Sequence, residues 1–159
     1  MDERWSAELL AALRELYEPT RRFAAIIGRH DVEPDDLVQD AFTKVLLAEP
    51  GTIRDLGPYV RRIVVNLAHN ERRRTRRGAR AIGRLGDDLV TRDRYPSELA
   101  DLWHLEPRVR ALLFLVDVEG EPVAAAAATV GMAAPAARMA LSRARRRLKS
   151  ELHVELAGE

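Results

Sequence analysis

The chain has 159 residues, of which 47% are hydrophobic and 5% aromatic, and it carries 26 basic and 25 acidic side chains. This length suits one domain or two small ones, with cores built from Leu, Val, Ile and Ala. The absence of cysteine excludes disulfides and thiolate metal sites. No apolar run approaches the roughly 20 residues that span a bilayer, and the charged start MDERWSAELL is unlike a signal peptide. We therefore expect a cytoplasmic protein without membrane insertion.

The net charge of +1 hides two strongly basic segments. Residues 59–80 hold eight arginines against one glutamate, and residues 138–149 hold five arginines and one lysine without an acid. A surface that serves only solubility mixes charges of both signs. The segregation therefore predicts a polyanion that binds at two places.

The first thirty residues predict two helices. One spans about residues 3–17, and Pro19 ends it and starts the second, because proline removes a hydrogen bond from a helix interior. Residues 28–31 are typical of a turn. Asp31 can cap the helix that follows.

A third helix is predicted from Pro34 to about Ala48, since proline is tolerated in a first turn. Helical spacing gives it an apolar face and a polar face. The apolar face comprises Leu37, Val38, Ala41, Phe42 and Val45. The polar face, which we call the acidic face, comprises Asp36, Gln39, Asp40 and Thr43. Compensation of the helix dipole would explain Asp36 better than Asp40, which lies beyond the first turn.

Residues 59–80 predict one long amphipathic helix, with Asp55 as its N-cap, Pro58 in its first turn and Gly78 near its end. Its apolar stripe comprises Val60, Ile63, Val64 and Leu67. An adjacent face, which we call the amide face, comprises Tyr59, Arg62, Asn66, Asn70 and Arg73. The arginine tail comprises Arg72, Arg73, Arg74, Arg76 and Arg77.

The amide face and the arginine tail suit nucleic acid. Side-chain amides can hydrogen-bond to base edges, and guanidinium groups can hold phosphates. Taken alone, this stretch leaves open a second interpretation, a solvated and charged helix end.

Beyond the arginine tail the helical pattern weakens. Residues 81–97 contain glycines, a proline and three aspartates, which is typical of a flexible linker. Helical spacing resumes near Glu98 and is interrupted by Pro107. A short helix over residues 122–130, a tight turn and a longer helix over residues 135–152 have the layout of a helix-turn-helix. We predict an all-α fold with two small helical domains, residues 1–80 and 98–159, joined by the flexible linker 81–97.

Four segments, taken in order, resemble the sigma factors of bacterial RNA polymerase. Residues 34–46, PDDLVQDAFTKVL, are similar to the family's acidic–Asp–Leu–Val–Gln–acidic–x–Phe motif. Residues 58–74, PYVRRIVVNLAHNERRR, resemble its minus-ten helix, with Asn66 at the family's asparagine position. Residues 105–120 and 138–150 resemble the entry to the last sigma domain and its recognition helix. So short a chain with only these two domains resembles the extracytoplasmic-function class.

The resemblance implies a promoter-specificity subunit that binds core RNA polymerase, recognises promoter DNA and helps to melt it. The acidic face would contact the clamp helices of the largest polymerase subunit, and the flap is a further polymerase contact. The amide face and the arginine tail would bind the minus-ten element, with Asn66 holding an extruded base. The residues implied for the minus-35 element are Pro135, Arg138, Met139, Ser142, Arg143 and Arg146. An anti-sigma factor is a further partner that the family allows.

Several departures from the family keep alternatives open. Tyr59 and Asn70 stand where the family has a tryptophan and an aspartate. In the helix-turn-helix, residues 125–127 are Ala-Ala-Ala instead of Glu-Ile-Ala, and residues 136–137 are Ala-Ala instead of Thr-Val. Alanine buries little area, so this domain either packs loosely, contacts mostly phosphate or has another role. A sigma mimic that sequesters an anti-sigma factor and an ordinary helix-turn-helix DNA-binding regulator are the alternative functions.

The sequence offers no signature of catalysis. No nucleophile lies beside a candidate base, and His30, His69, His104 and His153 lack the spacing of metal ligands. We predict a protein that is not an enzyme, with no catalytic residue, no metal site and no cofactor.

Overall fold

The computed structural model describes residues 6–29, 31–49, 51–82 and 104–156, and every regular element within these ranges is a helix. The predicted all-α fold is confirmed. In chain order the elements are α1 Ala7–Ile27, α2 Pro34–Leu47, α3 Leu56–Ile82, α5 Pro107–Leu113, the π-helix η3 Phe114–Val118, α6 Val123–Val130 and α7 Ala134–Leu156. The predicted linker 81–97 lies outside the described residues, except that α3 continues through its first two positions.

The first helix is continuous from Ala7 to Ile27, so the prediction of two helices broken at Pro19 is wrong. The predicted start near residue 3 lies outside the described residues; Ser6 is the N-cap, and its hydroxyl accepts the Leu9 N–H at 3.1 Å. Pro19 is exposed, so water can reach the carbonyl that the proline leaves unbonded. The buried residues on both sides of the proline keep one helical stripe: Leu13, Thr20, Phe23, Ala24 and Ile27. Packing of this stripe outweighs the lost hydrogen bond.

The second helix has the predicted bounds within one residue, but Asp31 does not cap it. Glu33 occupies the N-cap position, without a side-chain hydrogen bond, and Pro34 begins the first turn. Asp31 lies two residues before the cap and accepts two hydrogen bonds from Arg29, at 2.7 and 2.8 Å. The carboxylate therefore forms a local ion pair within the loop between α1 and α2.

The third helix continues through Gly78, so the prediction that Gly78 ends it is wrong. Gly78 has no positive φ, and the two residues that follow it, alanine and arginine, are strong helix formers. At the other end the Asp55 carbonyl accepts the Tyr59 N–H at 3.2 Å, which agrees with an N-cap at Asp55. Helices α1, α2 and α3 pack on one another as a three-helix unit.

The second half of the described chain contains the helix-turn-helix. Pro107 starts α5 and does not interrupt a helix, because a first-turn proline needs no N–H partner. α5 passes into η3 without a break. Gly131, with φ +72°, caps α6 in the left-handed conformation, and α7 then leaves at 98° to α6. α7 ends at Leu156, four residues beyond the prediction.

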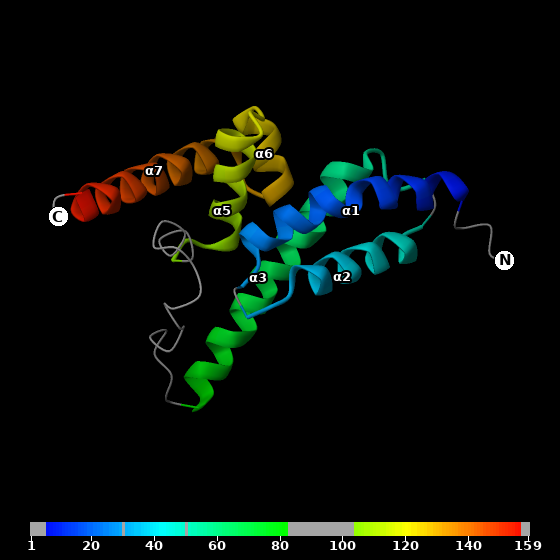
Figure 1. The fold of residues 1–159 in the computed structure, drawn as a ribbon, viewed down its shortest axis with the longest axis horizontal. Helices are drawn as coiled ribbons and strands as arrows, with labels where there is room; N and C mark the ends of the chain where they lie inside the picture. Colours follow the sequence, from blue (N-terminus) through cyan, green and yellow to red (C-terminus); the bar gives the residue numbers. More distant parts are fainter. Residues whose placement is uncertain (1–5, 30, 50, 83–103, 157–159) are drawn as a thin grey trace.

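The two halves of the protein are docked on each other. α5 packs on α1 and α3, α6 packs on α3, and α7 leads away from this body toward the C-terminus (Figure 1). The buried apolar residues of both halves form one cluster. No single described helix is long and apolar enough to cross a membrane, although α6 and the first part of α7 pass that test together, across their bend, by length and composition.

Candidate protein and nucleic-acid interfaces

The acidic face lies on the solvent side of α2. All four of its residues are exposed, while Leu37, Val38, Ala41 and Val45 on the opposite side are buried. The Thr43 hydroxyl donates to the Gln39 carbonyl at 2.8 Å. Within the described part of the chain, neither Asp36 nor Asp40 forms an ion pair. The helix period therefore placed this face correctly.

An apolar groove lies between α1 and α2, beside the acidic face. It has a volume of about 490 Å³ and is lined by Leu10, Leu13, Arg14, Tyr17, Phe42 and Leu46. Phe42 was predicted inside the core, but it is half-buried and meets the Tyr17 ring edge-on, with 6.4 Å between centroids. Gln39, Phe42 and Leu46 follow one another at helical spacing, so the groove and the acidic face form one continuous surface.

The sequence did not indicate how the rim of this groove is fixed. The Tyr17 hydroxyl donates to Asp35 at 2.6 Å, and Arg21 Nε donates to the same carboxylate at 3.1 Å. The Tyr17 hydrogen bond, with a smaller contribution from Arg21, lowers the pKa of Asp35. These contacts tie the start of α2 to α1 and hold the tyrosine ring over the groove.

The amide face is exposed along α3 as predicted. Arg62, Asn66, Asn70 and Arg73 are exposed, and Tyr59 is half-buried at the start of the line. Asn66 lies one helical turn from Arg62 and one from Asn70. The buried stripe differs slightly from the prediction, because Val65 is fully buried while Ile63 is only partly buried.

The arginine tail is exposed except at its first member. Arg73, Arg74, Arg76 and Arg77 are exposed and form no ion pair among the residues that the structure describes. Arg72 instead turns toward α5, and its Nη1 donates to the Leu105 carbonyl at 2.9 Å. In this arrangement four arginines of the tail, and not five, are available to phosphates.

The helix-turn-helix presents the predicted minus-35 residues on α7. All six are exposed: Pro135, Arg138, Met139, Ser142, Arg143 and Arg146. Of the four alanines that replace larger residues of the family, Ala126 and Ala137 are fully buried, while Ala125 and Ala136 are exposed. Small side chains let α6 and α7 approach closely at their contact. The burial of Ala126 and Ala137 argues against loose packing of this unit.

An ion pair also joins α7 to the π-helix. The Arg145 guanidinium donates to both carboxylate oxygens of Asp117, from Nε at 3.1 Å and from Nη2 at 2.5 Å. These hydrogen bonds raise the pKa of Arg145, which remains charged. Arg145 is thus paired with a carboxylate of its own domain, whereas none of the six predicted minus-35 residues forms an ion pair among the described residues.

Both halves of the chain match known protein families. Residues 12–78 match the family model of sigma-70 region 2, and residues 102–148 match that of sigma-70 region 4. Among solved structures, the chain is similar to the sigma factor RpoE of Bartonella quintana, solved in complex with the anti-sigma factor NepR. The TM-score is 0.71 and the identity 25%, over 94% of this chain and 99% of that chain. No curated protein sequence matches the chain.

The two matched regions contain the surfaces built above. Region 2 includes the acidic face and the amide face, and region 4 includes the helix-turn-helix. The two regions follow each other in the chain, and the structural match covers nearly the whole of it. The chain belongs to the sigma-70 family of RNA polymerase sigma factors, in its extracytoplasmic-function class, and acts in transcription initiation.

Proposed function

We propose that this sigma factor binds core RNA polymerase through α2, holds the minus-ten element on α3 and contacts the minus-35 element through α7. Residues 1–80 and 98–159 are its two working domains, and it acts in the cytoplasm. The observation that carries the proposal is the division of α2 and α3 into a buried apolar side and an exposed polar side. The exposed sides carry the polar residues of the matched motifs, among them Gln39, Asp40 and Asn66.

The acidic face and the groove together suit a basic helical partner. Asp36 and Asp40 have no ion pair within the described residues, so their charges are available to steer a basic surface during association. Phe42 and Leu46 add apolar area that a partner helix would bury. This combination supports the clamp helices of polymerase as the partner of α2.

The amide face suits an unpaired base. An amide offers a donor and an acceptor, so Asn66 can replace the pairing edge that an extruded base loses. Unstacking a base costs a few kcal/mol, which contacts with the protein must offset. Tyr59 lies two turns before Asn66 and provides a ring on which a base can stack. The exposed arginines of the tail then hold the adjoining phosphates.

An anti-sigma factor is the second proposed partner. The similar RpoE chain is held by NepR in its crystals. The present chain shares that fold over nearly its whole length, which supports regulation by a protein of the same kind.

The substitution Asn66→Ala tests base capture. Because Asn66 is exposed, the variant should fold and bind core polymerase as the wild type does. Transcription from a closed duplex promoter should fall about tenfold to a hundredfold, the effect of one or two lost base contacts. A promoter that is already unpaired across its minus-ten element should largely restore activity. An equal defect on both templates, or none on either, would refute the role of Asn66.

A further inference from the structure

The first turns of α7 carry one large apolar side chain among small ones. Met139 is 57% exposed. Its neighbours four and three positions before it are Pro135 and Ala136, and its neighbour three positions after it is Ser142. Because residues at this spacing adjoin on a helix surface, the methionine stands above a shallow surface of small side chains.

The direction of Met139 follows from the buried side of α7. Ala137 and Leu141 are at most 2% exposed, and α7 packs on α5 and α6. Met139 lies two residues from each of them, which is about 200° around the helix axis from both. It therefore lies on the side of α7 opposite the core, where its side chain is open to a partner molecule.

Arginines surround this apolar position. Arg138, Arg143 and Arg146 are exposed and form no ion pair among the residues that the structure describes. Their charges suit phosphates, which position a helix on DNA without reading its sequence. A single exposed hydrophobic side chain ordinarily has no significance. Met139, however, lies within a basic surface near the start of the second helix of a helix-turn-helix, where such a helix meets base edges in the major groove.

The chemistry of the methionine side chain limits what it can read. Its thioether sulfur is a weak acceptor and has no hydrogen to donate, so it gains little from the donor and acceptor groups of the bases. Thymine alone among the four bases presents an apolar group in the major groove, its 5-methyl group. The three rotatable bonds and the polarizable sulfur of methionine suit contact with such a group.

We infer that Met139 makes the minus-35 contact of α7 specific for a thymine, by packing against the 5-methyl group of that base. This inference rests on the proposed minus-35 contact, and it adds the base and the chemical group that are read. The element that α7 binds then contains at least one base pair that is selected by apolar contact and not by a hydrogen bond.

Replacement of thymine by deoxyuridine tests the inference, because it removes only the methyl group and keeps the pairing edge. The holoenzyme of core polymerase and this protein first selects the genomic fragments that it binds. Each thymine of the upstream element that these fragments share is then replaced singly, on either strand. Competition binding measures how much more tightly the holoenzyme binds the thymine duplex than the uracil duplex.

Loss of one buried methyl group should weaken binding by the wild type about fourfold at one position. In Met139→Ala the ratio of the two affinities should fall to about one at that position, because the side chain that contacts the methyl group is gone. The ratio compares two duplexes with the same protein, so any change in folding or in core binding cancels.

Two further variants serve as controls. Met139→Leu keeps an apolar side chain of similar size and should retain most of the discrimination. Val118→Ala shortens another exposed apolar side chain in the same half of the chain, 70% exposed on η3, and should keep the fourfold ratio.

The inference is refuted if the shared element contains no thymine on either strand, if uracil weakens binding by the wild type at no position, or if Met139→Ala keeps the ratio of the wild type. Specific binding and transcription despite any of these results would leave the proposed function standing. Conversely, the holoenzyme could show a uracil effect that Met139→Ala abolishes and still make no transcript from the same fragments. That result would support the thymine contact and overturn the proposed function in initiation.

Discussion

Removal of two arginines from the tail should weaken promoter binding and should make the affinity for the promoter less dependent on salt concentration. The variant is Arg74→Ala/Arg77→Ala, at two exposed positions without ion pairs among the described residues. Exposed substitutions of this kind change stability by no more than about 0.5 kcal/mol. Any loss of affinity should therefore reflect lost phosphate contacts.

The structure sets the size of the effect. Four tail arginines are exposed, because Arg72 is bonded to Leu105. Each phosphate contact contributes about −0.9 to the slope of log affinity against log salt. The four contribute about −3.6, and the variant should keep about −1.8 of this. Between 50 and 200 mM salt, the tail's share of the affinity should fall about 150-fold in the wild type and about 12-fold in the variant.

Fluorescence anisotropy of a labelled promoter fragment with the holoenzyme, over this salt range, measures both slopes. Arg22→Ala removes one charge from an exposed position of α1 that forms no ion pair among the described residues, and it should leave the slope unchanged. Phosphate contacts carry no sequence information, so all promoters should weaken by similar factors. Equal slopes for variant and wild type, or a loss confined to promoters that differ at one base, would refute the assignment.

Asp40→Arg should place like charges against polymerase and weaken core binding at least tenfold; a titration of labelled core enzyme measures this, and unchanged affinity would exclude the acidic face. Ser6→Ala should lower the free energy of unfolding by about 1 kcal/mol, because the Leu9 N–H loses its acceptor; chemical denaturation followed by circular dichroism checks the value. Burial, and secondly Arg108, lowers the pKa of His69 below 6.5. The unfolded chain therefore binds this proton more readily, and stability should be full above about pH 6.5 and fall as the pH drops below it. The drop in Tm between pH 7.5 and 5.5 should be smaller in His69→Gln, and an equal drop would contradict the burial of His69.

The faces of α2 and α3 could be predicted because helical periodicity alone decides which side chains share a side. Leu37, Val38 and Ala41 define a buried side, and the exposure of Asp40 on the other side follows. The same rule placed Asn66 on an exposed line. Local pattern is sufficient where one helix face packs on its immediate neighbours.

Tertiary packing overruled local signals elsewhere. Pro19 would end an isolated helix, but the stripe that continues from Leu13 to Ile27 holds α1 together. Gly78 looked like a helix end, and nothing in its surroundings forces the chain to turn there.

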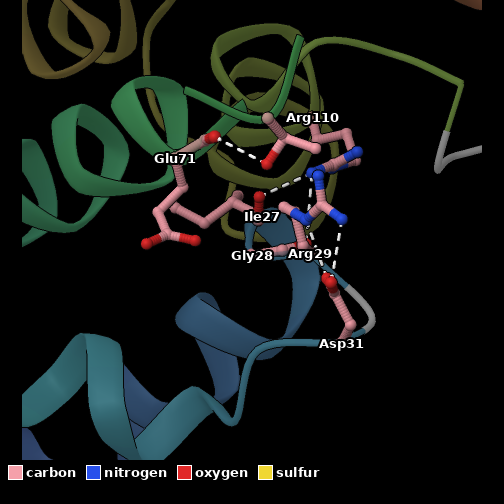
Figure 2. A network of polar contacts seen from close by, with 7 residues as sticks. Ile27, Gly28, Arg29, Asp31, Glu71 and Arg110 are labelled. Atoms are coloured by element: carbon pink, nitrogen blue, oxygen red, sulfur yellow. Dashed lines mark hydrogen bonds and ion pairs between the residues drawn. The ribbon is translucent and has the colours of Figure 1, made fainter. Parts of the chain in front are cut away.

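The contact between the two halves of the chain could not be predicted from the sequence. In the sequence Arg61 and Arg72 look like the exposed arginines beside them, and Arg110 has no neighbour that marks it as buried. Only the docking of α5 on α1 and α3, where Arg110 reaches the end of α1 (Figure 2), separates these three from the arginines that face solvent.

Run-off transcription with core RNA polymerase tests the central claim most directly. The templates should be genomic fragments recovered by binding to the reconstituted holoenzyme, since the promoter sequence follows from neither fold nor site. We expect transcripts with a defined start only when core enzyme and this protein are both present, and few or none with Asp40→Arg. The account would be contradicted if the protein bound core enzyme, DNA or an anti-sigma factor but gave no transcript from any recovered fragment. That result is the one expected of a sigma mimic or of a helix-turn-helix repressor.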